Sequence, residues 1–254
     1  MRFRERLGHA GSLLILFPLF VLYTAVLGTI SVASSLVDAR GGIQHTCARI
    51  WARMILWTCR IKVRVNGLER LTPGTAYVLC CNHQSHMDTP IILAALPFQF
   101  RFTPKKQLFR YPFLGWHLRR SGHVPIDREN PHAAVKSLKE AADTIRYGTP
   151  VVIFPEGGTS PDGAIRPFKG GGFMLAARAE AAVVPVTIRG SRAVLLPKTL
   201  YARPGIVEVV VGEPIPTAGV PAGELSSRVR RQIVETFNHG KTLDRNTYSI
   251  SREV

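Results

Sequence analysis

The sequence is poor in acidic residues and in cysteine. Aspartate and glutamate number 17 against 33 lysines and arginines, which gives a formal charge of +16 over 254 residues. This excess favours an anionic partner, and nucleic acid, anionic lipid and an acidic carrier protein all qualify. Cys47, Cys59, Cys80 and Cys81 form no pair of CxxC motifs and suggest no disulfide framework. We therefore expect a reducing compartment. Cys80 and Cys81 lie in an apolar strand-like run and are expected to be small buried side chains.

Several function classes lack their usual motifs. The sequence contains no zinc-finger or RNP-like pattern, so a nucleic-acid-binding module is not expected despite the charge. It contains no G-x-S-x-G, the nucleophile motif of many secreted hydrolases. No internal repeat or low-complexity run stands out, and no metal or prosthetic group is implied. The chemistry must therefore be sought in other motifs.

Charged side chains are also missing from residues 10–37. A helix needs about 20 apolar residues to cross the ~30 Å hydrocarbon layer, so this stretch is long enough, and Pro18 would only kink it. A secretory signal peptide is the competing interpretation, because residues 31–33 loosely resemble a cleavage site. The stretch is, however, longer than the ~7–15 apolar residues of such a peptide. We expect residues 1–38 to form a membrane anchor, either a transmembrane helix or a hairpin in one leaflet.

Basic residues lie on both sides of this segment. The heavier charge follows it, which favours a catalytic domain on the cytoplasmic face of the membrane. Residues 39–60 combine arginines with Trp51 and Trp57, which is typical of an amphipathic helix at the headgroup level. Packing of the same helix against its own domain is an equal alternative.

From residue 61 onward, short apolar runs alternate with helical patterns. One helix is expected from Asn130 and Pro131, a good N-cap and first helical residue, to Gly148. A last helix is expected from about Pro221 to Phe237. The alternation predicts a layered α/β domain over residues 61–254, with a mixed, mostly parallel sheet flanked by helices. The expected strands are 61–65, 75–81, 150–154, 183–188 and 206–211.

The first motif with chemical potential is NHQSHMD, residues 82–88, between an apolar strand and a helix. Polar groups at the end of a strand lie where α/β folds place active sites. A histidine can take a proton from a hydroxyl, and a carboxylate partner orients it and stabilises the imidazolium. His83 and Asp88 are candidates for these two roles, with His86 as a rival base. A chance histidine beside a helix-capping aspartate is the alternative.

Three further segments follow in order. Residues 103–109, TPKKQLF, lead to IDR at 126–128, whose cations either bind phosphate or form a solvated basic surface. Residues 151–160, VVIFPEGGTS, are an apolar strand followed by glycines, which permit close backbone approach to a ligand or form a plain turn. Residues 184–188, VPVTI, indicate a buried strand.

In this order and spacing, the four segments resemble the glycerolipid acyltransferase family, its lysophosphatidate acyltransferases in particular, over roughly residues 60–215. The family's blocks read N-H-x-x-x-x-D, K-x-E-L with a closing arginine, F-P-E-G-T-R-S and V-P-V. Two departures occur: Gln107 replaces the glutamate of the second block, and Gly158-Thr159 stand where Thr-Arg is common. The matching residues are Asn82, His83, Asp88, Lys105, Leu108, Arg128, Phe154, Pro155, Glu156, Gly157, Ser160, Val184, Pro185 and Val186.

The resemblance implies direct acyl transfer without an acyl-enzyme. His83 would be the general base and Asp88 would orient it. The acyl donor would be acyl-CoA or acyl carrier protein, the acceptor the sn-2 hydroxyl of lysophosphatidic acid at a membrane, and the product phosphatidic acid, with no metal or other cofactor. The substrate-binding residues implied are Lys105, Arg128, Glu156, Gly157 and Arg166, of which Glu156 would hydrogen-bond hydroxyl groups of the acceptor.

The missing arginine of the third block usually helps to hold the acceptor's phosphate. Arg166 or Lys169, just downstream, could replace it. Otherwise the acceptor is another lysophospholipid or an aminolipid precursor. A catalytically inactive membrane scaffold would keep the fold but lose the pair of His83 and Asp88, which is present.

Overall fold

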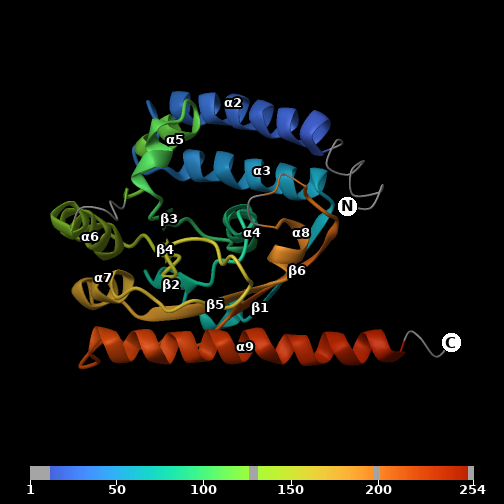
Figure 1. Ribbon diagram of the computed structural model, residues 1–254. Coiled ribbons are helices and arrows are strands. Elements are labelled where there is room, and N and C mark those ends of the chain that lie inside the picture. Colours follow the sequence, from blue (N-terminus) through green and yellow to red (C-terminus); the bar gives the residue numbers. More distant parts are fainter. Residues whose placement is uncertain (1–11, 126–130, 197–198, 200, 251–254) are drawn as a thin grey trace.

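The computed structural model describes residues 12–125, 131–196, 199 and 201–250, and its centre is a six-stranded sheet of order β1-β6-β5-β2-β4-β3 (Figure 1). All neighbouring strands run parallel except β5 and β6, which are antiparallel. The predicted mixed, mostly parallel sheet is therefore confirmed. The strands are β1 (Ile61–Asn66), β2 (Val78–Cys81), β3 (Arg101–Phe102), β4 (Val151–Ile153), β5 (Val183–Arg189) and β6 (Gly205–Val211).

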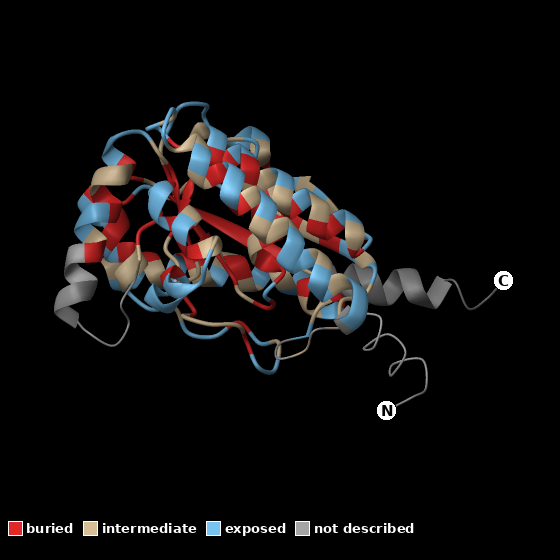
Figure 2. Cartoon of the chain, turned by 90° about the horizontal axis from the view of Figure 1, so that it is seen from above, coloured by how far each residue is buried: buried red, intermediate tan, exposed pale blue. Residues whose placement is uncertain are grey.

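Helices cover both faces of the sheet, so the central strands are buried on both sides, and Figure 2 shows buried segments enclosed by helices. One apolar cluster joins the sheet to α3 and α4, and the other joins it to α6, α7 and α9. Burial on both faces explains why these strands are continuous apolar runs without polar alternation. The helices after β1 are α4 (Asp88–Ala95), α5 (Leu114–Arg120), α6 (Pro131–Arg146), α7 (Gly171–Ala179), α8 (Ser191–Val194) and α9 (Ala222–Ile250), with short 3₁₀ helices at Leu68–Arg70 and Lys106–Arg110.

Two helices precede the sheet and lie side by side (Figure 1). A π-helical turn, Ser12–Leu16, leads into α2 (Phe17–Ser34), and α3 (Gly42–Thr58) returns along it. The carboxylate of Asp38 in the connection accepts the backbone N–H groups of Arg40, Gly41 and Ile43, which sets the start of α3. Leu14–Ser34 is, among the described residues, the one helix long and apolar enough to cross a membrane.

Helix α3 packs against its own domain. Ala52, Ile55 and Leu56 are buried in the core, whereas Ile50 and Trp57 are exposed. Packing and exposure therefore occur on different faces of one helix, so the two interpretations of this segment are compatible.

The expected elements differ from the observed ones mainly at their ends. Strand β2 begins at Val78, three residues later than the expected 75, and α9 continues past Phe237 to Ile250. Strand β3 was not expected, because two residues carry no recognisable period. Helix α6 starts at Pro131 as predicted, while its expected N-cap, Asn130, lies outside the described residues.

Candidate active site

The first and third motifs meet at one edge of the sheet. Strands β2 and β4 are parallel neighbours that end at Cys81 and Ile153, so the residues following them emerge together. The Asn82 side chain holds the backbone at the point where the chain leaves β2. Its Oδ1 accepts the Ile188 N–H at 2.7 Å and its Nδ2 donates to the Ile188 carbonyl at 3.0 Å. The side-chain amide of Asn82 thus continues the hydrogen bonding between β2 and β5 for one residue beyond the end of β2.

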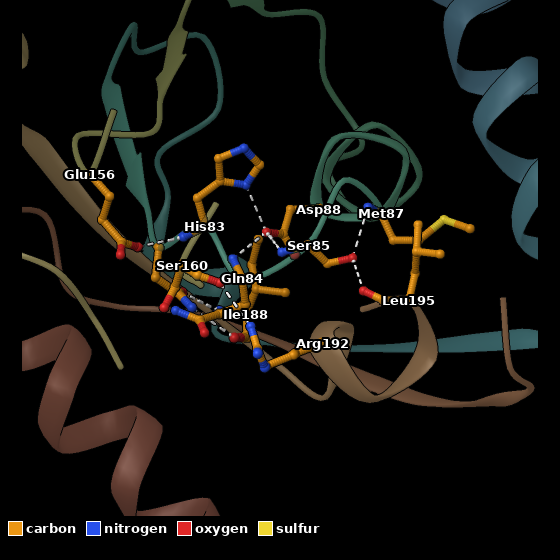
Figure 3. A network of polar contacts seen from close by, with 11 residues as sticks. His83, Gln84, Ser85, Met87, Asp88, Glu156, Ser160, Ile188, Arg192 and Leu195 are labelled. Atoms are coloured by element: carbon orange, nitrogen blue, oxygen red, sulfur yellow. Dashed lines mark hydrogen bonds and ion pairs between the residues drawn. The ribbon is translucent and has the colours of Figure 1, made fainter. Parts of the chain in front are cut away.

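The predicted pair of His83 and Asp88 is formed. Asp88 is the first residue of α4 and is fully buried. Its Oδ2 lies 2.9 Å from His83 Nδ1 and also accepts the backbone N–H groups of Gln84 and Ser85, at 2.7 and 2.9 Å (Figure 3). Because the carboxylate accepts, the His83 proton sits on Nδ1 and Nε2 keeps its lone pair. His83 is therefore in the tautomer that a general base requires.

The His83 ring is also held from one side. The Phe154 ring stacks on it with centroids 4.3 Å apart and planes 23° apart. The His83 side chain remains 15% exposed. Asp88 and Phe154 together orient the imidazole and leave part of it open to a ligand.

Glu156 holds the backbone around His83. The side chain is 2% exposed, and its Oε1 accepts the His83 N–H at 2.6 Å while Oε2 accepts the Arg166 N–H at 2.8 Å (Figure 3 shows the former contact). Burial raises the pKa of Glu156, and the two N–H donors oppose that rise. Both carboxylate oxygens therefore bind backbone, a role that the sequence analysis missed. Binding of an acceptor hydroxyl by Glu156 stays a prediction.

The other predicted site residues lie at varying depth. Gly157 follows Glu156 with φ +79°, and its N–H donates to the Phe154 carbonyl at 3.2 Å. Lys105 is exposed at the start of the 3₁₀ helix Lys106–Arg110. The side chain of Arg166 is exposed, while its backbone binds Glu156. Arg128 lies outside the described residues, so its expected role is not located.

His86, the rival base, is oriented differently. Its side chain is exposed, and no hydrogen bond joins its ring to Asp88 in the part of the chain that the structure describes. Partial desolvation of the ring lowers its pKa, the nearby His83 lowers it further, and Asp88 opposes the shift. The geometry therefore favours His83 as the base.

An apolar cavity of about 340 Å³ begins beside the first motif. His86 and Met87 line it on the motif side, Phe17 and Phe20 of α2 on another, and Ile55 of α3 on a third. Its size falls within the usual range for small-molecule sites, about 300–1,000 Å³. The cavity therefore lies between the N-terminal helices and the motif that carries His83 and Asp88.

Two further side chains hold segments of the site by donating hydrogen bonds to backbone carbonyl groups. Ser85 Oγ donates to the Leu195 carbonyl at 2.7 Å and accepts the Met87 N–H at 3.2 Å. Arg192 donates from both Nη atoms, to the carbonyls of Ser160 and Pro161, at 2.8 and 2.7 Å. These contacts join residues up to 110 positions apart, and nothing in the local sequence indicates them.

Both the sequence and the fold are similar to those of known proteins. A protein-family model described as Acyltransferase matches residues 62–189. The 1-acyl-sn-glycerol-3-phosphate acyltransferase BAT2, chloroplastic, of Brassica napus is 33% identical over 201 residues, which cover 78% of this chain and 57% of that protein. A 1-acyl-sn-glycerol-3-phosphate acyltransferase of Pseudomonas aeruginosa is 32% identical over 196 residues, which cover 74% of this chain and 75% of that protein.

A solved structure also matches. The crystal structure of the 1-acyl-sn-glycerophosphate (LPA) acyltransferase PlsC from Thermotoga maritima superimposes with a TM-score of 0.74 and 25% identity, over 88% of this chain and 95% of that one. The chain spans just over half the length of the Brassica napus protein and of a similar chloroplastic protein of Arabidopsis thaliana.

Proposed function

The chain belongs to the acyltransferase family, and from that premise we propose that it transfers a fatty acyl group to the sn-2 hydroxyl of lysophosphatidic acid, giving phosphatidic acid for phospholipid biosynthesis. The observation that carries the proposal is the buried Asp88 carboxylate on His83 Nδ1, which leaves Nε2 free to accept a proton. The names of the similar proteins, all 1-acyl-sn-glycerol-3-phosphate acyltransferases, support this acceptor.

His83 Nε2 takes the proton of the acceptor hydroxyl as its oxygen attacks the thioester carbonyl. The carbon–sulfur bond then breaks, and the leaving thiolate is protonated by the imidazolium. Asp88 stabilises that imidazolium through the 2.9 Å contact to Nδ1. A positioned general base of this kind contributes about 10²–10⁴-fold to the rate.

The acyl chain is proposed to occupy the apolar cavity beside His86 and Met87. Acyl-CoA or acyl carrier protein would supply the thioester, and the +16 charge suits either anionic donor. Lys105, Arg128, Gly157 and Arg166 remain proposed contacts of the substrates.

We also propose that the protein works on a membrane, with residues 1–38 as anchor, 39–60 as interfacial segment and 61–254 as the acyltransferase domain on the cytoplasmic face. Many large apolar side chains of α2 are exposed, among them Phe17, Val21, Leu22, Val26 and Ile30. A lysolipid could then reach the cavity, which α2 partly lines, without crossing water. Within the described part of residues 1–38 the chain forms one continuous helix from Phe17 to Ser34 and not a hairpin. The packing of this helix along α3 supports a placement of α2 in one leaflet.

The test is thiol release from a long-chain acyl-CoA by the protein in mild detergent. Lysophosphatidic acid, lysophosphatidylcholine and glycerol 3-phosphate are supplied separately, and acyl carrier protein replaces CoA in a parallel series. The rate with lysophosphatidic acid should fall about 10²–10⁴-fold in His83→Ala, because the base is lost. His239→Ala, which changes an exposed histidine on α9, is the matched control and should keep the wild-type rate. His86→Ala tests the rival base and should lower kcat by less than about tenfold.

Each outcome decides one point. A near wild-type rate in His83→Ala contradicts the assignment of the base. Release only with another lysolipid keeps the mechanism and changes the acceptor. Absence of release with every acceptor and both donors leaves the inactive scaffold as the better interpretation.

A further inference from the structure

The short helix α8 contacts both loops that hold His83. Its first contact is made by Arg192, whose Nη1 and Nη2 donate to the carbonyl groups of Ser160 and Pro161 at 2.8 and 2.7 Å. Its second contact is the carbonyl of Leu195, which accepts the Ser85 hydroxyl at 2.7 Å. Because α8 spans only Ser191–Val194 and Leu195 follows it directly, one small unit joins the loop after β4 to the loop after β2.

These contacts close a hydrogen-bonded ring that includes His83, Ser85, Leu195, Arg192 and Ser160 (Figure 3). The Ser160 N–H donates to the His83 carbonyl at 2.9 Å, so Ser160 binds His83 through its N–H and Arg192 through its carbonyl. From His83 the chain itself leads to Ser85, and Ser85 binds Leu195. Each link of the ring is therefore a covalent bond or a hydrogen bond.

The ring is sheltered from water and fits its surroundings closely. Ser85 and Ser160 are fully buried, and Arg192 is partly buried. Gly163 has φ +89°, and a Cβ atom there would lie 3.1 Å from Arg192 Cδ, so a glycine is needed where the arginine passes over the loop. A buried group that loses its hydrogen-bond partner costs free energy, so the loops must shift if a link is broken.

Helix α8 is itself fixed to the sheet. Gly190, the residue before it, has φ +85°, and a Cβ atom there would lie 2.7 Å from the Ile206 carbonyl oxygen of β6. At the other end of α8, the Val194 carbonyl accepts the Arg203 N–H at 2.7 Å. The two contacts that α8 makes with the site therefore have a firm base.

The ring acts on a group of His83 that the other contacts leave untouched. Asp88 and Phe154 hold the imidazole, and Glu156 accepts the His83 N–H. The ring holds the His83 carbonyl. A shift of the backbone at His83 moves Nε2 away from the acceptor hydroxyl, and a misplacement of about 1 Å can lower a rate by about 10²-fold.

We propose that Arg192 is a positioning residue for acyl transfer, which aligns His83 by closing this ring through α8. The inference rests on the proposed function, because it gives the ring a role in that reaction. Arg192 acts through Ser160 and not on the substrates. A ring is opened by the loss of any one link, so the loss of a second link should have little further effect.

The experiment is a double-mutant cycle in the full chain, with lysophosphatidic acid and a long-chain acyl-CoA as substrates. Arg192→Met removes both donors at similar side-chain length. Ser85→Ala removes the bond to Leu195 but keeps the Ser85 N–H that binds Asp88. Each single change should lower kcat about 10- to 100-fold, because His83 Nε2 moves. The KM for each substrate should stay within about threefold of wild type, because no substrate contact is lost.

The double variant decides whether the two contacts belong to one ring. Its kcat should lie within about threefold of that of the slower single variant, whereas independent contacts would give the product of the two decreases. Arg192→Lys, which keeps the charge and can reach one of the two carbonyl groups, should recover part of the kcat.

Arg146→Met is the matched control. Arg146 also donates from a guanidinium nitrogen to a backbone carbonyl, that of Arg178, but this contact joins α6 to α7 and is not part of the ring. The control should keep the wild-type kcat. Thermal unfolding of every variant gives the folded fraction at the assay temperature, and kcat is expressed per folded molecule.

Several results would overturn the inference. One is a decrease in the double variant equal to the product of the single decreases, and another is a kcat for Arg192→Met within about threefold of wild type. A raised KM with unchanged kcat would assign Arg192 to substrate binding instead. Failure of the proposed function looks different: the wild-type protein itself does not use lysophosphatidic acid, and this inference falls with it.

Discussion

Three buried polar side chains organise the site by binding backbone. Asn82 pairs with Ile188, Asp88 Oδ2 gathers two backbone N–H groups besides His83, and Glu156 joins His83 to Arg166. Buried polar groups are costly unless they are hydrogen-bonded, so each of these side chains both stabilises the loops and restricts the histidine. These three motif residues therefore position the backbone and ring of His83, in addition to their predicted chemical roles.

Glu156→Gln tests this role of Glu156. The amide NH2 would face one of the two backbone N–H groups, so one hydrogen bond to a charged acceptor is lost. We expect the free energy of unfolding to fall by about 1–3 kcal/mol. The kcat should fall with it, because the His83 backbone is released, while the KM for the acceptor stays unchanged. Urea unfolding and steady-state kinetics measure the two effects.

Glu224→Gln on the exposed start of α9 is the control, because an exposed ion pair such as its 4.0 Å contact with Arg228 contributes little. Unchanged stability in Glu156→Gln together with a raised KM for the acceptor would contradict the positioning role. It would support instead the prediction that Glu156 binds acceptor hydroxyls.

At the scale of elements, the N-terminal helix pair is the feature on which the proposed membrane attachment depends. Trp51 Nε1 of α3 donates to Thr24 Oγ1 of α2 at 3.0 Å, and the hydroxyl groups of Tyr23 and Thr58 are 3.2 Å apart. Ser31 Oγ lies 2.6 Å from His117 Nδ1, which joins α2 to α5 as well. Helix α2 is thus attached along its length, and a perpendicular crossing would carry α3 and α5 into the bilayer.

A labelling experiment distinguishes a placement of α2 in one leaflet from a transmembrane span. Single substitutions Arg6→Cys and Arg40→Cys place thiols on the two sides of the apolar segment, and the four natural cysteines are buried and free. We expect a membrane-impermeant maleimide to reach both positions from the cytoplasmic face of sealed vesicles, because the proposed arrangement keeps α2 in one leaflet. Labelling from opposite faces would contradict this arrangement and favour a span. The unsubstituted chain, which should remain unlabelled, is the control.

At the scale of the whole molecule, α2 and α9 cover opposite sides of the layered domain (Figure 1). Beneath α2 lies a group of histidines around Arg101: His45 and His123 are buried, and His117 is partly buried. Burial, aided by Arg101, lowers the pKa of His45 and of His117 to about 4 and that of His123 well below its usual range. Arg49 also faces His45, and Asp38 is the carboxylate that acts on Arg101.

These histidines predict loss of stability in mild acid. Unfolded histidine titrates near pH 6.5, whereas the folded histidines take up protons only near pH 4 or below, so the unfolded chain binds more protons as the pH falls. The stabilisation is complete above about pH 6.5 and is lost progressively towards about pH 4. Urea unfolding at pH 7.5 and pH 5.5 should show the decrease, and His117→Gln should reduce it. Equal stability at both pH values would contradict the prediction.

Much of the architecture follows from local sequence. Apolar runs and helix signals predict five of the six strands and α6, because alternation and capping are properties of neighbouring residues. The spacing of His83 and Asp88 and the order of the four segments identify the family, which the comparisons confirm. The two-residue β3 escaped prediction, because its pairing with β4 exists only in the assembled sheet.

Tertiary structure alone decided the rest. Glu156 meets His83 across 73 residues and Asn82 meets Ile188 across 106, because the parallel strands end at one edge of the sheet. The sequence offered Arg166 and Lys169 as replacements for the missing arginine, and both are exposed. Only the fold shows that the Lys169 side chain lies across Gly157, whereas Arg166 binds Glu156 through its backbone. Local residues thus determined the elements and the chemical groups, whereas packing between distant segments determined which groups meet.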